Sequence, residues 1–262
     1  MIQDAELSGR VLQVGLRVIE RTLREQCPGA PPTARYGGVT YIHRFGSSLN
    51  AHLHYHSCMI DGLFAQTEDG LQFYEVTGLS DEVIQQAQMK IRKRVLRLFV
   101  RRGLLSSDDA EQMQTWQNGG GFSLNAAVRI EGADRQGLER LFRYCARPIF
   151  AGERLCWQEE DERLIYRLRK PQHDGQTLLR LTPAEFLDRI ALLMPPPRRH
   201  RHRYHGVLAP NAPLRKEVAN RAGQPVTGES VVSADKPKVG VDEEQAVGCP
   251  FASIWAMLLA RI

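Results

Sequence analysis

Three histidines alternate in the segment HLHYH, where His52, His54 and His56 stand two positions apart. In a β-strand, alternate side chains leave the same face about 6.6 Å from one another. Imidazole nitrogens on one face can lean together and bind one metal ion, and only the neutral ring does so. The pattern therefore predicts a metal site that weakens as the pH falls through about 6.5. The alternative is a solvated strand face with ordinary polar residues.

Two further features qualify this metal site. Asp61 follows the histidine segment at a turn, and we expect it to orient one of the histidine ligands. The HExxH signature of helical zinc proteases is absent from the sequence, so a zinc protease is not indicated. By ligand preference, imidazole favours manganese or another transition ion over magnesium.

A second constellation surrounds Tyr144 in the segment DRQGLERLFRYCARP, residues 134–148. Its apolar residues recur with a helical period, and at about 100° per residue Tyr144 lies at the edge of the apolar stripe. Three arginines flank it: Arg140, Arg143 and Arg147. A tyrosine hydroxyl can attack a phosphodiester while guanidinium groups hold the phosphate. Because a phenol has a pKa of about 10, a metal-polarised phosphate or a local base must assist. The alternative is a tyrosine at the edge of the core.

Basic residues concentrate in two segments of a chain whose net charge is +5. The first segment is part of the helix predicted over residues 81–102, which could follow a DNA backbone or be a solvated surface helix. The second segment, RRHRHRYH at 198–205, is expected either to contact DNA or to form a polar loop. The basic residues of the predicted helix are Lys90, Arg92, Lys93, Arg94, Arg97, Arg101 and Arg102.

The elements that must position these residues follow from periodicity and turn signals. Helices are predicted over residues 5–26, 81–102, 134–147 and 183–193. Strands are predicted over residues 37–45, 52–64, 71–77, 122–132, 163–170 and 176–182. This order predicts an α+β fold with a largely antiparallel sheet backed by helices.

The remaining sequence excludes several classes of protein. The five cysteines are scattered without a CxxC pair, which indicates a reducing compartment and argues against a cysteine-based zinc site. No apolar run reaches the roughly 18 residues that span a bilayer, and no secretory signal is visible. Residues 216–248 are predicted to form a linker, and SIWAMLLARI (253–262) to begin an amphipathic helix.

Taken together, these stretches resemble the HUH-type rolling-circle insertion-sequence transposases. GGVTYIHRFGSSLNAHLHYHSCMIDGLF looks like the metal-binding segment of that family, in which an HxH pair follows an RFGSxLN stretch. FSLNAAVRI, LERLFRYCARPIFAGERL, YRLRKPQHDG and RYHGVLAPNAPLR are similar to further blocks of the family, in the same order. The resemblance covers about residues 10–215 and the SIWAMLLARI segment.

The resemblance implies an HUH endonuclease core and a chemistry for it. It implies that His54 and His56 bind magnesium or manganese, with His52 as a third ligand. It implies that Tyr144 cuts single-stranded DNA at the element ends, forming a 5′-phosphotyrosine link and freeing a 3′-OH, while Arg140, Arg143 or Arg147 holds the phosphate. A bacterial, cytoplasmic protein associated with the nucleoid is expected.

The resemblance also implies a domain plan and some departures from it. The catalytic domain is expected over residues 37–215, after a helical segment at 1–36 and before a linker and a truncated helix at 216–262. Arg140 stands where some members carry another tyrosine, so the chain is similar to the one-tyrosine branch. The cysteine-rich zinc domain usual at the start is missing, which suggests truncation at both ends. An inactive DNA-binding remnant, a relaxase and a replication initiator are the alternatives.

Overall fold

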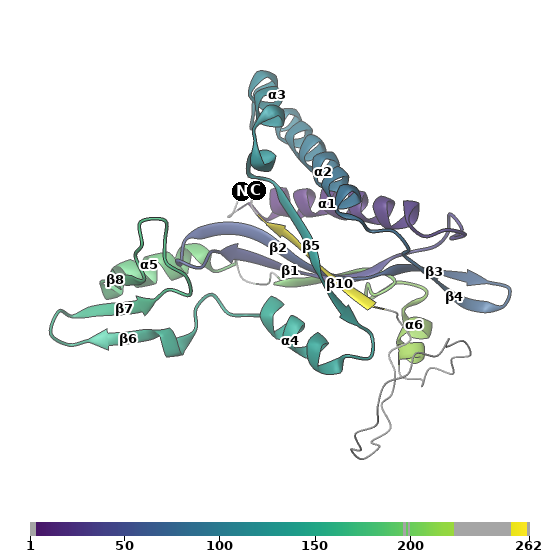
Figure 1. Cartoon of the computed structure of the whole chain (residues 1–262). Coiled ribbons are helices and arrows are strands. Elements are labelled where there is room, and N and C mark those ends of the chain that lie inside the picture. The colour runs from purple at the N-terminus through teal and green to yellow at the C-terminus, as the bar shows by residue number, and fades with distance from the viewer. Residues whose placement is uncertain (1–3, 196–197, 199, 223–252, 261–262) are drawn as a thin grey trace, which may run out of the picture.

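The computed structural model describes residues 4–195, 198, 200–222 and 253–260, and it shows the predicted α+β architecture. A five-stranded sheet forms the centre of the molecule, with strand order β5–β10–β2–β1–β9 and every neighbouring pair antiparallel (Figure 1). Its strands are β1 (Gly37–Phe45), β2 (Ala51–Ile60), β5 (Ser123–Glu131), β9 (His202–Gly206) and β10 (Ser253–Ala260). An antiparallel sheet of this kind needs helices over the faces that it buries.

One face of the sheet is covered by α1 (Ala5–Glu25) and α2 (Asp81–Arg101), and α3 (Ser107–Thr115) packs on α2 further from the sheet (Figure 1). The apolar stripe of α1 packs on Leu53 and Tyr55, which point to this face from β2. The hydroxyl of Tyr55 donates a hydrogen bond to the carbonyl of Ser8, 2.7 Å away. The alternation along β2 therefore directs Leu53 and Tyr55 into this core and the histidines between them to the opposite face.

The opposite face of the sheet is contacted by α4 (Arg135–Cys145), the helix that carries the candidate tyrosine. The helix begins after Asp134, whose carboxylate accepts a hydrogen bond from the backbone N–H of Gly137 at 2.7 Å. Leu141 and Cys145 are buried against Val39 of β1 and Cys58 of β2. This contact fixes which side of α4 faces the sheet.

Smaller elements flank the central sheet. A three-stranded sheet of β6 (Leu155–Gln158), β7 (Arg163–Arg167) and β8 (Leu178–Leu181) packs with α5 (Pro183–Leu193) on Phe45 and Leu49. A hairpin forms from β3 (Gly62–Thr67) and β4 (Gly70–Glu75), and α6 (Arg215–Ala222) lies beyond β9. Two short 3-10 turns lie at Asn118–Gly121 and Gly152–Arg154.

Most predicted elements are confirmed within a few residues, including β1 over 37–45 and α5 over 183–193. The predicted strand over 52–64 is wrong in its length, because the chain turns at Asp61 and continues as β3. The helix α3, the strands β6 and β9 and the helix α6 were not predicted. The last of these occupies the first part of the expected linker, whose residues 223–248 lie outside the described part of the chain.

The predicted helix over 253–262 is wrong, because residues 253–260 form β10. This strand lies between β2 and β5 and pairs with both. A short apolar run fits a buried strand as well as a helix, and periodicity alone does not separate the two. The tertiary context decides, because β2 and β5 each present an edge whose backbone groups need hydrogen-bond partners.

Candidate active site

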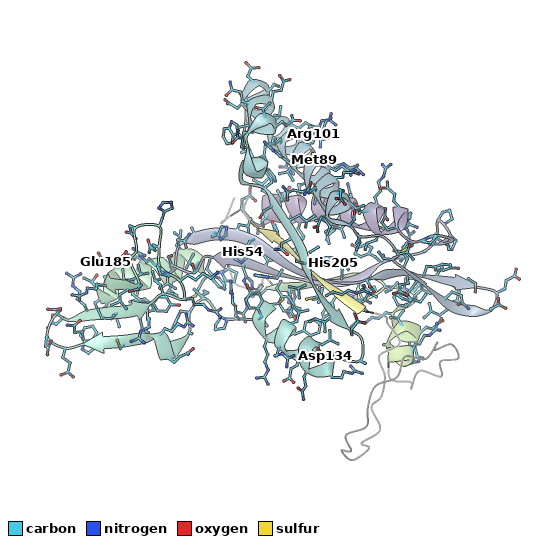
Figure 2. All side chains as sticks on the ribbon, in the orientation of Figure 1. His54, Met89, Arg101, Asp134, Glu185 and His205 are labelled. Carbon is cyan, nitrogen blue, oxygen red and sulfur yellow. The ribbon has the colours of Figure 1, made fainter. Side chains whose placement is uncertain are left out.

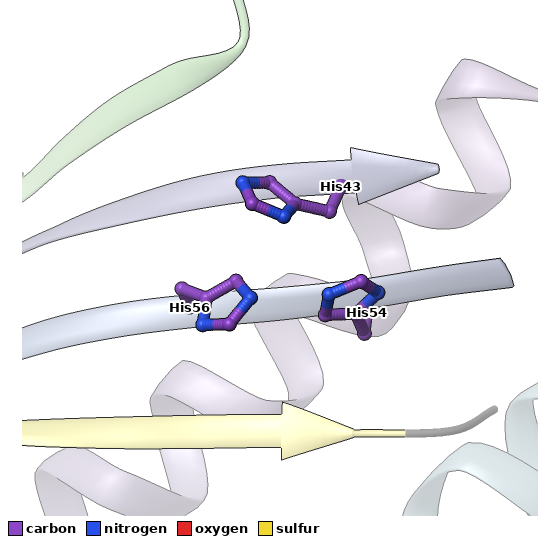
Figure 3. Close-up of side chains that lie close together, drawn as sticks. All are labelled: His43, His54 and His56. Carbon is purple, nitrogen blue, oxygen red and sulfur yellow. The ribbon is translucent and has the colours of Figure 1, made fainter. Parts of the chain in front are cut away.

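Three histidines converge on the α4 face of the sheet, and two of them are those predicted from the sequence. His43 of β1 lies directly opposite His54 of β2, and His56 is two residues further along the same face. Their candidate ligand atoms lie within 4.8 Å of one another, and all three side chains are buried (Figure 3). The ring centroids are separated by 5.1 Å for His43 and His54, 4.5 Å for His43 and His56, and 4.9 Å for His54 and His56.

His43 was not among the ligands predicted from the sequence, where His52 was expected as the third. The ring of His52 stacks on that of His54, with 4.9 Å between centroids, but the converging group consists of His43, His54 and His56. The only feature that could have identified His43 as a ligand is the register of the β1–β2 hairpin, which puts His43 opposite His54. That register contains an irregularity between His43 and Phe45, so counting residues from the turn does not reveal it.

Hydrogen bonds set which ring nitrogens can bind a metal. His43 Nε2 lies 2.7 Å from the carbonyl oxygen of Cys145, and since a carbonyl only accepts, this nitrogen must donate. His54 Nδ1 donates in the same way to the carbonyl of His52 at 3.3 Å. His43 Nδ1 and His56 Nε2 are buried without a hydrogen-bond partner. A buried acceptor with no donor fits a divalent metal ion well, and in His43 the backbone carbonyl of Cys145 orients the ring that carries it.

The protonation states of the three rings also suit metal binding. Burial lowers the pKa of His43 and of His54 to about 4, and that of His56 to about 2. Neighbouring histidine and arginine charges lower the pKa of His54 and His56 further. The rings are therefore neutral near pH 7, with their lone pairs available.

The candidate nucleophile lies beside this cluster. The ring of Tyr144 meets that of His56 edge to face, with 5.2 Å between centroids, and 44% of the tyrosine remains exposed. The guanidinium of Arg147 lies over the Tyr144 ring at 4.8 Å and near the Phe45 ring at 5.9 Å. Arg147 Nε is buried without a hydrogen-bond partner. This arrangement brings a partly exposed hydroxyl and a cation next to three buried rings that could hold a metal ion.

The other two predicted arginines lie differently on α4. Arg143 pairs with Glu139 at 2.6 Å, and both side chains are exposed. Arg140 is exposed one helical turn before Tyr144. Of the three arginines, Arg147 is the one whose guanidinium lies over the tyrosine ring.

Asp61 does not have the position expected for orienting a ligand. Its buried carboxylate lies 3.1 Å from the guanidinium of Arg129 on β5. It comes five residues after His56, about 16 Å along an extended chain. The ion pair with Arg129 links the end of β2 to β5, away from the histidine cluster.

The basic helix α2 packs in the same core as Leu53 and Tyr55, so it lies on the opposite side of the sheet from the histidines. Figure 2 shows Arg101 on this helix, above the sheet. Arg92 is buried and donates to the carbonyl of Trp116, while Lys90 and Arg102 pair with Glu25 and Glu6. A cavity of about 770 Å³ between α1, α2 and α3 is lined by the other basic residues of the set, together with Arg17. These are Lys93, Arg94, Arg97 and Arg101.

The second basic segment forms β9 in part. Its residues His202 to Gly206 pair with β1, and Tyr204 is exposed. Burial lowers the pKa of His205 to about 4, which keeps this ring neutral as well. His202 contacts Tyr41, with 5.9 Å between ring centroids, at the edge of the α4 face.

Comparison with known proteins gives one family. The family model Y2_Tnp, described as "Putative transposase", matches residues 37–216 of this chain. No curated protein and no solved structure matches it. The matched residues contain the whole histidine cluster and α4. Among the described residues, no helix has the length and apolar character required to cross a membrane.

Proposed function

The chain belongs to this transposase family, and we propose that it moves a DNA element by cutting and rejoining a single DNA strand through a tyrosine. The observation that carries the proposal is the edge-to-face contact of Tyr144 with His56, inside a cluster of three neutral, buried histidines. A tyrosine hydroxyl beside a metal site has the nucleophile and the Lewis acid with which a phosphodiester can be transesterified.

The covalent step is a transesterification at phosphorus. The Oη atom of Tyr144 attacks the scissile phosphate, a P–O bond to tyrosine forms, and the P–O3′ bond breaks. The phenol loses a proton and the leaving 3′ oxygen gains one, so the products are a 5′-phosphotyrosine and a free 3′-OH. Attack of a 3′-OH on the phosphotyrosine reverses the step and rejoins a strand, which needs no external energy source.

The histidine cluster has a defined part in this step. His43 Nδ1, His54 Nε2 and His56 Nε2 would hold a divalent metal ion, and such an ion polarises the scissile phosphate and offsets its developing charge. Imidazole ligands favour manganese or another transition ion, while the family resemblance also allows magnesium. The backbone carbonyls of Cys145 and His52 keep the rings of His43 and His54 oriented for this purpose.

Arg147 is the residue that we assign to the phosphate. Its guanidinium is already held over the Tyr144 ring, and its Nε has a donor without a partner. A guanidinium can hold two phosphate oxygens at once, which restricts the angle of attack. Arg140 and Arg143 lie on the exposed side of α4, where they are suited to phosphates further along the strand.

Formation of a covalent protein–DNA adduct tests the proposal. Labelled single-stranded DNA of randomised sequence is incubated with the protein and manganese, and the products are separated on a denaturing gel. We expect an adduct with the wild type and none with Tyr144→Phe, which keeps the ring and removes the attacking oxygen. An adduct that persists in Tyr144→Phe, or that maps to Tyr166 or Tyr204, would show that another residue is the nucleophile.

A further inference from the structure

A small pocket opens directly beside the proposed site and shares two side chains with it. It has a volume of about 210 Å³ and is formed where the end of β1, the segment after α4 and the end of β7 meet. Phe45 and Arg147 line it, and the same two residues contact the histidine cluster and Tyr144. Whatever occupies the pocket is therefore next to the reacting phosphate.

The lining of this pocket has the chemistry of a nucleobase site. Aromatic surface comes from Phe45, Phe150 and Tyr166, and guanidinium groups come from Arg147, Arg154 and Arg169. The lining also includes the carboxylate of Glu153, which can accept a hydrogen bond from a base amino group. Unpaired bases in protein complexes stack on aromatic rings and on arginine planes in this way.

The size of the pocket limits what it can hold. Pockets for drug-sized ligands span about 300–1,000 Å³, so this one is suited to a single ring system. In a duplex a base is stacked and paired, so only an unpaired or extruded base can enter. Because this inference rests on the proposed function, the base belongs to the DNA strand that Tyr144 attacks.

We propose that this pocket binds one unpaired base next to the scissile phosphate, and so contributes to the choice of the cutting position. Phe45 couples the two sites: its ring stacks on His43 at 4.8 Å and meets His54 at 6.5 Å. Arg147 lies between Phe45 and Tyr144, with its guanidinium near both rings. A base in the pocket fixes the sugar attached to it, and thereby the phosphate in front of the tyrosine.

The experiment separates recognition of the base from binding of the charged phosphates, and it does not depend on cleavage. Binding of hexadeoxynucleotides, one for each base, is measured by fluorescence anisotropy in EDTA with the Tyr144→Phe protein. The comparison probe is an abasic hexamer with the same number of phosphates. We expect at least one base-containing hexamer to bind about ten-fold more tightly than the abasic one, as base stacking predicts.

Variants of the pocket identify where the base is bound. Phe150→Ala removes a stacking surface, and Ala151→Leu fills the pocket without removing core. Either should reduce the preference for the base-containing hexamer and leave abasic binding unchanged. Arg169→Ala should weaken the preference more than Arg167→Ala, an exposed arginine of β7 that does not line the pocket. A preference that survives both Phe150→Ala and Ala151→Leu would overturn the proposal.

Two further outcomes are informative. Equal binding of the abasic and base-containing hexamers by the Tyr144→Phe protein would show that only charge is recognised, and would also overturn it. The measurement does not use cleavage, so absence of the covalent adduct would reject the proposed function while leaving base binding measurable. Since Phe150 contacts Phe186, thermal unfolding is measured for each variant to exclude loss of the small sheet.

Discussion

At the scale of single residues, the two ring nitrogens of His43 have different tasks. One donates to the carbonyl of Cys145, the residue next to Tyr144, and the other points without a partner toward His54 and His56. His43 thus connects α4, the helix of the proposed nucleophile, to the candidate metal site. His52 has a different position, stacked on His54 at the start of β2.

The assignment of His43 leads to a direct comparison of two variants. We expect His43→Ala to weaken manganese binding by about 100-fold or more, since loss of an outer partner alone can cost 10–100-fold. We expect His52→Ala to weaken it little. Isothermal titration with manganese measures both, and thermal unfolding in EDTA shows whether each variant is folded. Strong loss in His52→Ala with none in His43→Ala would reverse the assignment.

The lowered pKa values of the cluster predict how metal binding depends on pH. The sequence alone predicts weakening through pH 6.5, but burial lowers the pKa of His43 and His54 to about 4. Protons compete with the metal for the same lone pairs only near the pKa that the histidines have in the folded protein. We therefore expect the manganese affinity to stay constant from pH 7 to about pH 5 and to decrease toward pH 4. Titrations from pH 7 to pH 4 measure this, and a midpoint near pH 6.5 would contradict it.

The same shifts predict the stability of the metal-free protein. In the unfolded chain the histidines bind protons near pH 6.5, whereas the folded cluster resists them until about pH 4. The unfolded state therefore gains protons first, and the free energy of unfolding should fall as the pH drops from 6.5 toward 4. Urea unfolding in EDTA measures this fall. The double variant His54→Gln/His56→Gln should show a smaller decrease in the free energy of unfolding over this pH range, because it lacks two of the shifted histidines.

At the scale of elements, the position of α4 decides whether Tyr144 reaches the cluster. The helix is held to the sheet by Leu141 and Cys145, and the Cys145 sulfur lies 3.8 Å from that of Cys58. Tyr144 itself contributes an exposed ring and little packing. The position of the proposed nucleophile therefore depends on neighbouring apolar residues that have no role in the proposed chemistry.

Weakening the contact between α4 and the sheet should therefore slow adduct formation by more than the loss of folded protein accounts for. We expect Leu141→Ala to cost about 2–4 kcal/mol of unfolding free energy and to slow adduct formation beyond the loss of folded protein. Leu23→Ala, in α1 on the other face, should cost a similar amount and leave the adduct rate of the folded fraction unchanged. Urea unfolding and adduct kinetics measure both, and equal adduct rates would argue against a positioning role of this contact.

For the molecule as a whole, the basic residues of α2 and the proposed active site lie on opposite faces of the central sheet. The histidine cluster faces α4, whereas Lys93, Arg94, Arg97 and Arg101 surround a cavity beneath α2. A DNA strand that uses both must pass around the edge of the sheet. The basic helix would then contribute affinity along the backbone and not the geometry of the cut.

This separation predicts different effects on binding and on catalysis. We expect the triple variant Lys93→Ala/Arg94→Ala/Arg97→Ala to bind single-stranded DNA more weakly and to reduce the slope of log affinity against log salt by up to about 2. The adduct rate at saturating DNA should not change. Arg92→Ala should instead destabilise the protein, because its buried guanidinium holds the carbonyl of Trp116. An unchanged salt slope in the triple variant would exclude this face from DNA binding.

Elements whose patterns are local could be predicted from the sequence. Strand alternation in β2 assigned the histidines to one face, and the helical period of residues 134–147 put Tyr144 at the edge of an apolar stripe, because both periods are set by backbone geometry. The resemblance of the motifs indicated the transposase family, which the family match over residues 37–216 confirms.

Features that depend on pairing between distant segments could not be predicted from the sequence and are visible in the folded chain alone. The register of β1 against β2 brought His43 opposite His54, and the contact of α4 with the sheet brought Tyr144 to His56. The insertion of residues 253–260 between β2 and β5 made a strand of a segment predicted to be helical. Backbone pairing and packing between distant segments outweigh local propensity in such cases, and they leave no periodic signal in the sequence.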